Sequence, residues 1–561
     1  MWTQQYDPMG SWPLSTLVAA LPVLVLLGLL ATGRVTAWAA ALAGLVTASA
    51  VALGPFGMPW KMAAASIGLG FVFATVRIVW LIVAAVFLYD IAVETGQFDV
   101  MKASIARLSA DRRLQAVLVA FCFGALIEGA AGFGAPVAIS AAFLVGLGFR
   151  PFQAALLCLI ANTAPVAWGG IGTPILTLSA VTGLNVQALS ATCGRILPIL
   201  SLVIPFWLVA TMTSWRATWA VRVPLLVIGG TFAAVQFAWS NAVGFELVDI
   251  VSSVASLLAG VLVVRFWRPR EVWRFEGDPD PATLESVHLT TRQVARAWMP
   301  FALLTAFVLI WGLPASKAMG TPAVKEGLDH LVSWKPEVSW LHLQVARGQA
   351  VTGHEVATDA DREKAIAEFL PLSSTGTAVF LAAILSGYLL GLPTGAMARQ
   401  FGRTVRRMVP AIAAILCMLA IGFVTRYAGM DAVLGLAFTR TGRLMYPVFG
   451  TLLGWLGVAL TGSDTASNVL FGNLQRITAE KLGLDPILMA SANSTGGVMG
   501  KMIDAQSIVV AAAATGEGGH EGSLLRAVLR HSILLALIVG AIVWFYAHVA
   551  TGVVVSAPTP F

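Results

Sequence analysis

Charged residues are scarce in this chain. Only 11% of its 561 residues are Asp, Glu, Lys or Arg, whereas 58% are hydrophobic. A soluble globular domain carries about 25% charged residues, so this composition excludes an ordinary soluble fold. Many segments stay apolar for about 20 residues, which is the length that a helix needs to cross a bilayer. The sequence therefore predicts an all-α polytopic membrane protein.

Cysteine is also rare, and its pattern excludes two kinds of site. The chain has four cysteines, all in apolar segments and far apart in sequence. It has no CxxC pair and no Cys/His cluster, so neither a disulfide framework nor a zinc site is supported. We expect no metal and no cofactor, and we interpret the cysteines as small core residues.

The motifs of nucleotide-driven and hydrolytic enzymes are missing. The Gly-rich stretch 129–134 lacks the Gly-Lys-Ser/Thr ending of a phosphate-binding loop, and the chain has no HExxH or GxSxG motif. The formal net charge of +7 comes from Lys and Arg in short loops. Such residues set membrane orientation and do not indicate nucleic-acid binding. We therefore expect a protein that is not an enzyme, with transport that is secondary rather than ATP-driven.

A polar motif occurs twice within otherwise apolar stretches. The first copy covers 128–136 and continues to Asn162, Thr163 and Gly169, and the second covers 461–468 and continues to 493–495 and Gly500. The interval from Asn162 to Gly169 equals that from Asn493 to Gly500. Polar groups and helix breaks in lipid usually mark a substrate or ion path. Two such breaks in corresponding halves point to the midplane site of a secondary transporter.

The expected architecture has about 12–14 transmembrane helices, with broken helices or re-entrant hairpins at the two motifs. The transporter class implies two inverted repeats. Four basic loops should be cytoplasmic, which places both termini outside. The predicted order is N-terminal scaffold helices (1–113), a first transport region with a hairpin (114–213), scaffold helices (214–314), an extracytoplasmic loop (315–372), scaffold helices (373–445), a second transport region with a hairpin (446–515) and a C-terminal helix (516–561).

Two carboxyl groups are candidates for proton coupling. Glu128 ends an apolar run beside the Gly-rich break, where desolvation favours the neutral form that carries a proton. The alternative is a helix-end carboxylate bonded to free backbone N–H groups. Asp464 lies among Ser, Thr and Asn residues that suit a coupling or gating role. Its alternative is an N-cap for a helix that starts near Ala466.

The remaining polar residues of the motifs are candidates for substrate binding. Their amides and hydroxyls can donate to a carboxylate or a neighbouring hydroxyl, and half-helix N-termini add partial positive charge. Interhelical hydrogen bonding is the alternative. Lys501 could be the counter-charge of the substrate, although Asp504 could neutralise it, and Arg195 could serve the same end or snorkel to the interface. The candidates are Asn162, Thr163, Asn493, Ser494, Thr495, Lys501, Arg195, Ser463 and Asn468, with the hairpin glycines Gly129, Gly132, Gly134, Gly169, Gly462 and Gly500.

These motifs resemble the bacterial lactate permease family. The similar stretches include 121–125, 128–137, 144–149, 162–167, 457–468 and 495–502, and the resemblance runs nearly end to end. It departs in the outside loop, around Arg77 and Asp90, and at Asp504. The resemblance implies import of L-lactate, often with D-lactate and glycolate, by proton symport across the bacterial inner membrane. It also implies an elevator-like transporter, by analogy with ion transporters that have paired hairpins.

The functional hypothesis places lactate near the midplane, between the two motifs. Its carboxylate would meet half-helix N-termini, asparagine amides and a cation, while Glu128 or Asp464 takes the co-transported proton. Sodium-coupled uptake of small carboxylates is the alternative within transport, and an intramembrane enzyme or a passive channel are rivals from other classes. The expected partners are lactate, H⁺ and the lipid bilayer, with no nucleic acid. A homo-oligomer and the choice among the hydroxy acids are left open.

Overall fold

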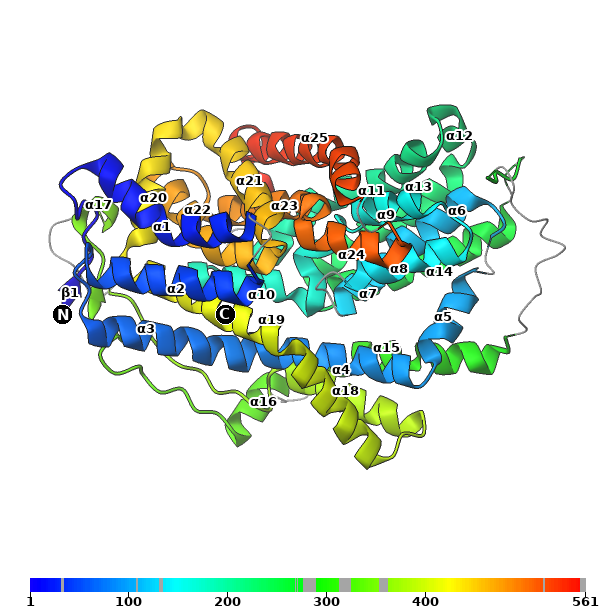
Figure 1. Cartoon of the computed structure of the whole chain (residues 1–561), viewed down its shortest axis with the longest axis horizontal. Helices are drawn as coiled ribbons and strands as arrows, with labels where there is room; N and C mark the ends of the chain where they lie inside the picture. The colour runs from blue at the N-terminus through cyan, green and yellow to red at the C-terminus, as the bar shows by residue number, and fades with distance from the viewer. Residues whose placement is uncertain are drawn as a thin grey trace.

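The structure is a computed structural model of the whole chain. It describes all residues except 32–34, 107–108, 131–134, 268, 270, 276–288, 312–323, 353–361, 518–519 and 555–561. The described chain is almost entirely helical. Most helices run along the long axis of the molecule, with the N-terminus at one end and α12 near the other (Figure 1).

Seven helical segments in the described residues are long and apolar enough to cross a bilayer, and a bent helix pair provides an eighth. Four shorter apolar helices add to this set. The protein is therefore a multi-pass membrane protein, while the expected number of about 12–14 spans stays a prediction. The seven are α3–η1–α4 (Trp60–Phe73, Ala74–Val79 and Trp80–Glu94), α6–η2–α7 (Arg112–Ala116, Val117–Phe123 and Gly124–Ala130), α11 (Val186–Met212), α13 (Arg222–Ala242), α14 (Val248–Phe266), α19 (Thr394–Ala428) and α25 (Glu521–His548).

The other elements complete the bundle and its ends. They are α1 (Trp12–Ala31), α2 (Ala37–Leu53), α5 (Gln97–Ala106), α8 (Ala135–Gly146), α9 (Pro151–Ala161), η3 (Val166–Trp168), α10 (Gly169–Thr182), α12 (Trp215–Ala220), α15 (Thr291–Trp311), α16 (Val324–Leu331), α17 (Gln349–Thr352), α18 (Thr375–Leu389), α20 (Met430–Phe438), η6 (Thr439–Thr441), α21 (Gly442–Thr461), α22 (Asp464–Leu482), α23 (Pro486–Gly500), η7 (Lys501–Ile503), α24 (Ala505–Thr515) and η8 (Thr551–Val553).

The two halves of the chain present helical elements in the same order. Each half has a 35-residue helical segment (α3–α4 and α19), a short helix, a hairpin (α7 with α8, α21 with α22), a broken helix (α9 with α10, α23 with α24) and a long helix (α11 and α25). The halves also interlock, because α10 packs against α22 and α11 against α23. This shared order agrees with the repeat predicted from the motifs, and the inverted relation of the repeats stays a prediction.

The first helix of the first hairpin lies in the interior of the molecule. The whole segment 112–130 is buried, as expected of a helix that is apolar on all sides. Local signals in the sequence define the second hairpin and the helix after it. Gly462 ends α21 in the left-handed region at φ 71°, and Asp485 caps α23 with Pro486 at its first position.

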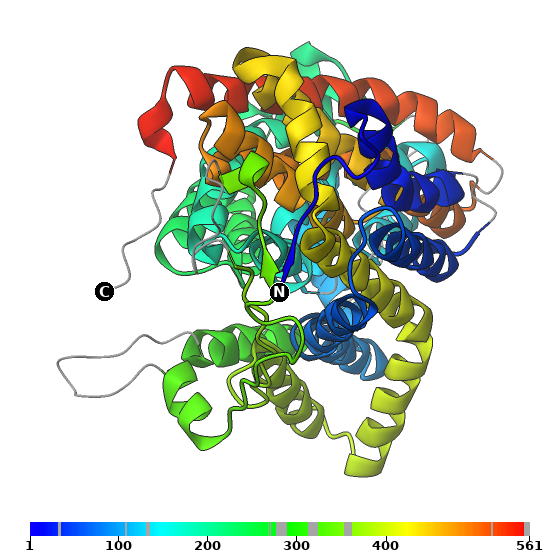
Figure 2. The ribbon, with the colours of Figure 1, turned by 90° about the vertical axis from the view of Figure 1, so that its left-hand side faces the viewer.

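The part of the polar insert 315–372 around β2 (Val345–Ala346) and α17 lies at the same end of the bundle as the N-terminus. Strand β2 pairs in parallel with β1 (Trp2–Thr3), with Trp2 opposite Val345. Figure 2 looks at this end and shows β1 and the described part of the insert across the helix ends. The Gln4 side chain donates to the carbonyl oxygens of Arg426 and Tyr427, so the N-terminus is tied to the end of α19.

Candidate functional site

Glu128 lies in the last turn of α7, which is the first helix of the first hairpin. Its side chain is 4% exposed, and its Oε2 atom has no hydrogen-bond partner among the described residues. The other oxygen lies against Gly169, since a Cβ added to that glycine would come within 2.6 Å of Oε1. Gly169 therefore permits the close approach of the carboxyl to α10. The predicted hairpin glycines Gly132 and Gly134 lie outside the described residues.

The break between α9 and α10 occurs where the sequence predicts it. The two helices meet at 65°, and Gly170, Ile171 and Gly172 follow one another at φ 52°, 59° and 75°. A β-branched residue in the left-handed region is an outlier that costs about 1–3 kcal/mol, so Ile171 must be held by its surroundings. Gly172 leaves no room for a side chain, because an added Cβ would lie 2.7 Å from the backbone oxygen of Phe245.

Asn162 and Thr163, at the start of this break, differ in their bonding. Asn162 is 4% exposed, and neither atom of its side-chain amide has a hydrogen-bond partner among the described residues. Thr163 donates through Oγ1 to the carbonyl oxygen of Ile160 at 2.8 Å. The Asn162 amide lies beside the Glu128 carboxyl, with which it interacts without a well-formed hydrogen bond. The Thr163 hydroxyl is already engaged by its own helix.

The second hairpin places Asp464 at the start of α22. Ser463 is the N-cap, accepting a hydrogen bond from the Ala466 N–H at 3.3 Å. The alternative reading of Asp464 as the N-cap is therefore wrong, because the serine already fills that role. Asp464 Oδ2 instead accepts from Ser494 Oγ at 2.5 Å and from Asn468 Nδ2 at 3.4 Å.

The second oxygen of Asp464 repeats the arrangement seen at Glu128. Oδ1 has no hydrogen-bond partner among the described residues, and a Cβ added to Gly497 would come within 2.4 Å of it. Each hairpin thus presents one carboxyl oxygen to a glycine of the following broken helix. In both places a buried oxygen remains free, which is uncommon for a polar group inside a protein.

The second broken helix is interrupted within the range 488–514 that the sequence predicts, but after its Asn-rich part. α23 is continuous through 493–495 to Gly500, and the chain leaves the helix at η7 and Asp504. The Asn493 side chain is directed sideways, donating to Asn468 Oδ1 at 2.9 Å, so it does not compete for the helix backbone. Small residues also hold α23 against α21, since a Cβ on Gly454 would lie 2.0 Å from the Asn493 backbone oxygen.

Three other candidates in this region are part of the same close packing. Thr495 Oγ1 is 3.5 Å from the Ala492 carbonyl oxygen, within its own helix. Gly500 lies against the backbone of α21, where an added Cβ would meet the Trp455 oxygen at 2.3 Å. Gly462 supplies the left-handed turn between α21 and α22. These contacts explain why small residues and short hydroxyls occupy the second motif.

Lys501 connects the break in the second half to the tip of its hairpin. The ammonium donates to the Gly462 carbonyl oxygen at 2.6 Å and lies 3.5 Å from Asp504 Oδ2. The predicted pairing of Lys501 with Asp504 is confirmed, and both side chains are buried. Lys501 also interacts electrostatically with Glu128 and with Asp464, so it lies near the carboxyls of both halves.

The two motifs therefore meet in one buried polar cluster. A direct bond joins the halves where Asn468 Nδ2 donates to the Pro174 carbonyl oxygen at 3.2 Å. We call this group the central cluster, and its members are Glu128, Asn162, Asp464, Asn468, Asn493, Ser494, Lys501 and Asp504. Figure 1 shows α7, α10, α23 and α24 near the middle of the long axis of the molecule.

Arg195 makes its contacts elsewhere. Its Nε donates to Asn241 Oδ1 at 3.0 Å, and another guanidinium nitrogen donates to the carbonyl oxygen of Val553. These partners are at the end of α13 and in η8. Among the described residues, the contacts of Arg195 do not join it to the central cluster, which leaves Lys501 as the candidate cation of the site.

One buried carboxyl of this region escaped the sequence analysis. Asp249, the second residue of α14, is 1% exposed and interacts electrostatically with Glu128. A Cβ added to Gly129 would lie 2.9 Å from Asp249 Cβ, so the two helices are in close contact here. The available signal was an acid within the first turn of an apolar span, which is costly in a membrane and usually functional.

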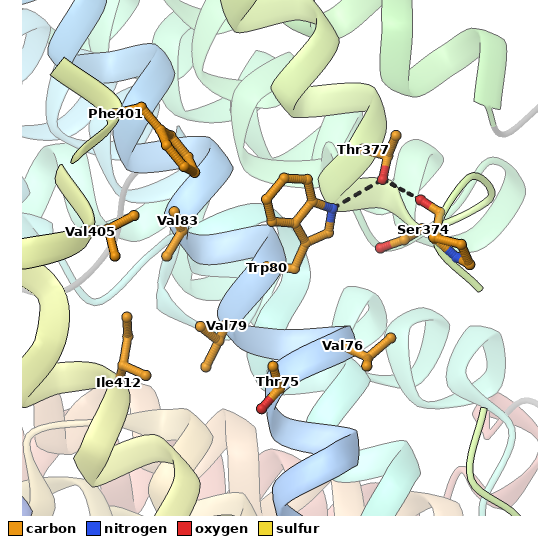
Figure 3. Close-up of a pocket in the computed structure, with 11 residues that line it drawn as sticks. Thr75, Val76, Val79, Trp80, Val83, Ser374, Thr377, Phe401, Val405 and Ile412 are labelled. Atoms are coloured by element: carbon orange, nitrogen blue, oxygen red, sulfur yellow. Dashed lines mark hydrogen bonds between the residues drawn. The ribbon is translucent and has the colours of Figure 1, made fainter. Parts of the chain in front are cut away.

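A cavity of about 450 Å³ lies apart from this cluster (Figure 3). Its walls come from η1, α4, α18 and α19 and are mostly apolar, with Trp80 Nε1 donating to Thr377 Oγ1 at 3.0 Å. None of the predicted site residues lines it. This cavity therefore belongs to other helices than those of the central cluster.

The long apolar helices, interrupted by buried polar breaks, are those of a multi-pass membrane transporter. The chain belongs to the L-lactate permease family, whose model matches residues 15–550. It is 43% identical over 571 residues to the glycolate permease GlcA of Escherichia coli (strain K12), with 99% of this chain and 100% of the relative covered. It is 44% identical over 557 residues to the L-lactate permease of Salmonella typhimurium, with 98% and 99% covered.

A solved structure, that of Neisseria gonorrhoeae MtrF, aligns with a TM-score of 0.45 and 13% sequence identity. The alignment covers 87% of this chain and 84% of that one. Membership in the family is shown by the family model and the sequence relatives.

Proposed function

We propose that this protein imports L-lactate, with D-lactate and glycolate as further substrates, by proton symport across the inner membrane of a bacterium. Its relatives are named for L-lactate and for glycolate, which are both small 2-hydroxy acids. The observation that carries the proposal is the set of free, buried polar atoms where the two motifs meet: Glu128 Oε2, both amide atoms of Asn162, and Asp464 Oδ1. Buried polar groups are normally bonded, so this set favours a ligand site.

The substrate carboxylate would be held by positive charge at the breaks. Lys501 provides an ammonium, and the N-termini of α10 and α24 add partial positive charge. Asn162 would donate its amide N–H to the carboxylate and accept from the 2-hydroxyl through its oxygen. In this arrangement Asn493, Ser494 and Asn468 position Asp464 rather than contact lactate, because their polar atoms are bonded within the cluster.

The co-transported proton would be carried by a carboxyl of the cluster. Glu128, Asp464 and Asp504 are buried with a single ammonium, that of Lys501. An uncompensated buried charge is strongly unfavourable, and the lactate anion would add one more. Proton binding at Glu128 or Asp464 would offset that charge, so the loaded site could move across the membrane.

Movement would follow an elevator-like scheme with two inverted repeats. The regions 114–213 and 446–515 would carry the site, and the segments 1–113, 214–314 and 373–445 would form the scaffold. The order of elements shared by the two halves and the contact between α10 and α22 support this division. Trapping lactate alternately from each side, with cysteine cross-links between the two sets of helices, would test it.

The proposal is tested by lactate uptake into vesicles that contain the purified full-length protein. With a pH gradient of one unit, symport of one proton with each lactate anion drives about tenfold accumulation of lactate. Glu128→Gln and Asp464→Asn should lose this accumulation. Asp431→Asn is the matched control, because Asp431 is also buried but bonded to Asn473 in the second half, away from Glu128.

The outcomes separate proton symport from its main rival. If both carboxyl variants still concentrate lactate against a gradient, the assignment of the proton is wrong. If accumulation follows an imposed Na⁺ gradient at equal pH, the sodium-coupled alternative holds instead. Competition by D-lactate and glycolate decides the substrate range, and collapse of uptake by a protonophore confirms that the pH gradient drives it.

A further inference from the structure

Asp249 is a buried carboxyl group that no hydrogen bond explains. Its side chain is 1% exposed, and neither Oδ1 nor Oδ2 has a hydrogen-bond partner among the described residues. A buried acid without partners is costly when charged and is usually retained for a function. Assignment of the chain to its family does not depend on Asp249.

The ordinary structural explanations for such an acid are not met. The N-cap of α14 is Leu247, and although Asp249 lies in the first turn, its oxygens accept none of the free backbone N–H groups there. The basic residue of α14 itself, Arg265, is 16 positions further on, which is about 24 Å along a helix. Helix capping and ion pairing within the helix therefore do not account for Asp249.

Among the elements packed on α14, the charged group that interacts with Asp249 is on α7. The elements packed most extensively on α14 are α7, η2, α10 and α13. Neither η2 nor α10 contains a charged residue, and Arg222 of α13 begins that helix at the end remote from Asp249. Glu246 precedes α14 in the turn. The group that faces Asp249 is Glu128 of α7, with which it interacts electrostatically.

Gly129 brings the two carboxyl-bearing helices together. A Cβ at this position would lie 2.9 Å from Asp249 Cβ and 3.1 Å from the backbone nitrogen of Ile250. The first distance is shorter than real Cβ contacts and the second is unusually tight, so the close approach of α7 to α14 depends on glycine at residue 129. Both carboxyl groups are buried on these two helices, and each has at least one oxygen without a hydrogen-bond partner among the described residues.

We propose that Asp249 and Glu128 form one proton-carrying unit, a carboxyl pair on α14 and α7 that holds a single shared proton in the transport cycle. Two neighbouring carboxylates avoid carrying two negative charges at once, so one proton serves both. The proton comes from water on the outer side, forms an O–H bond on one carboxyl, and leaves that oxygen for water on the inner side. This deepens the proposed symport and rests on it.

The pair also lies at a contact between a proposed transport region and the proposed scaffold helices. Glu128 belongs to the first proposed transport region, and Asp249 belongs to the helices between the two transport regions. Loss of the shared proton would leave two like charges across this contact. Proton binding would therefore favour the packed arrangement of α7 against α14, and proton release would favour their separation.

The first test compares two transport modes in vesicles that contain the full-length protein. Asp249→Asn should retain exchange of labelled lactate at equal pH, within a few-fold of the parent protein. Accumulation under a pH gradient of one unit should fall from about tenfold to near onefold. Asp249→Glu keeps a carboxyl and should restore part of the gradient dependence, while Asp431→Asn should keep all of it.

The second test does not require transport. Infrared difference spectra of the purified full-length protein, titrated with pH, report the band of protonated carboxyl groups. One shared proton predicts that Asp249→Asn and Glu128→Gln each remove or shift the same band, and that the double variant removes no further one. An unchanged band in Asp249→Asn, or undiminished gradient-driven accumulation, overturns the proposal.

The two tests also separate this proposal from the proposed function. If the parent protein does not take up lactate, the symport proposal fails, while the infrared titration still decides whether Asp249 shares a proton with Glu128. If Asp249→Asn is not produced in folded form, Asp249→Glu provides the same comparison. The longer side chain of Asp249→Glu alters the geometry of the pair. If this variant keeps the full gradient dependence of uptake and an unshifted carboxyl band, Asp249 and Glu128 do not share a proton.

Discussion

Glu363 is the anchor of the insert 315–372, and its removal should release this segment from the membrane helices. The side chain is 4% exposed. Oε1 accepts a hydrogen bond from Arg347 Nε at 2.7 Å, and Oε2 accepts from Arg426 Nη2 at 2.9 Å. Arg426 belongs to α19 and also donates to the Ala180 carbonyl oxygen of α10 at 3.2 Å. One carboxylate thus holds the insert, α19 and α10 together.

The strength of this anchor follows from the pKa of Glu363. Burial alone would raise it, but Arg426 and Arg347 lower the pKa from the ordinary 4.5 to about 2. Each pH unit between the two values is worth about 1.4 kcal/mol, so the ionised carboxylate stabilises the docked insert by about 3 kcal/mol at neutral pH. Breaking a buried ion pair typically costs about 3–5 kcal/mol, which agrees.

Hydrogen–deuterium exchange at β2 measures this contribution. In Glu363→Gln at pH 7, the amides of Val345 and Ala346 should exchange about 100-fold faster than in the parent protein, because about 3 kcal/mol corresponds to two factors of ten. In the parent protein the contribution is complete above pH 4.5. It should decrease as the pH falls toward 2, because the folded-state pKa is the lower one.

The matched control is Glu337→Gln in the same insert. Glu337 is 73% exposed and pairs with His342 at 3.5 Å on the surface, where an ion pair is worth about 0–1 kcal/mol. Its removal should leave β2 exchange nearly unchanged. Equal protection of β2 in the parent protein and in Glu363→Gln at pH 7 would refute the reasoning, since the ion network would then not hold the insert.

Two further predictions concern packing and charge in the second half. Gly454→Ala should destabilise the protein by about 1–3 kcal/mol or more, because its Cβ would lie 2.0 Å from the Asn493 backbone oxygen. Gly68→Ala, with no atom within 4 Å of its Cβ, should be neutral or stabilising by up to about 1 kcal/mol. Thermal unfolding in detergent measures both, and equal melting temperatures would contradict the packing argument. Lys501→Met should cost about 3–5 kcal/mol in the same assay, because it leaves Asp504 buried without its ion pair; an unchanged melting temperature would show that the pair contributes nothing.

Apolar length predicted the membrane helices well where the helices are uniformly apolar. The predicted C-terminal helix within 516–561 corresponds to α25 (Glu521–His548), and the first break lies between α9 and α10, where the first motif reaches Asn162, Thr163 and Gly169. Helix ends are harder to predict where polar residues are buried inside a helix. α11 begins at Val186, where the Asn185 side chain caps it, and its first turns bury Ser190 and Thr192. A hydropathy profile assigns such polar residues to a loop instead of a membrane helix.

The second break shows the same difficulty at the site. The cluster of Asn493, Ser494 and Thr495 resembled an interruption, because these residues favour non-helical backbone when they bond to it. In the structure, Asn493 and Ser494 bond to the neighbouring helix α22 instead. The chain leaves the helix only at Lys501, whose ammonium bonds to the hairpin tip at Gly462. The hydrogen-bond partner of a buried polar side chain therefore depends on residues far away in sequence.

Composition and the repeated motif by themselves determined that this chain is a helical membrane protein with two polar breaks, because lipid tolerates so few polar groups that each one carries information. The family resemblance followed from the same motif residues. Tertiary structure alone decided which of these groups meet. It brought Lys501 near the carboxyls of both halves, directed Arg195 to Asn241, and placed Asp249 beside Glu128. Electrostatic interactions act through space, so their partners are set by helix packing and not by spacing along the chain.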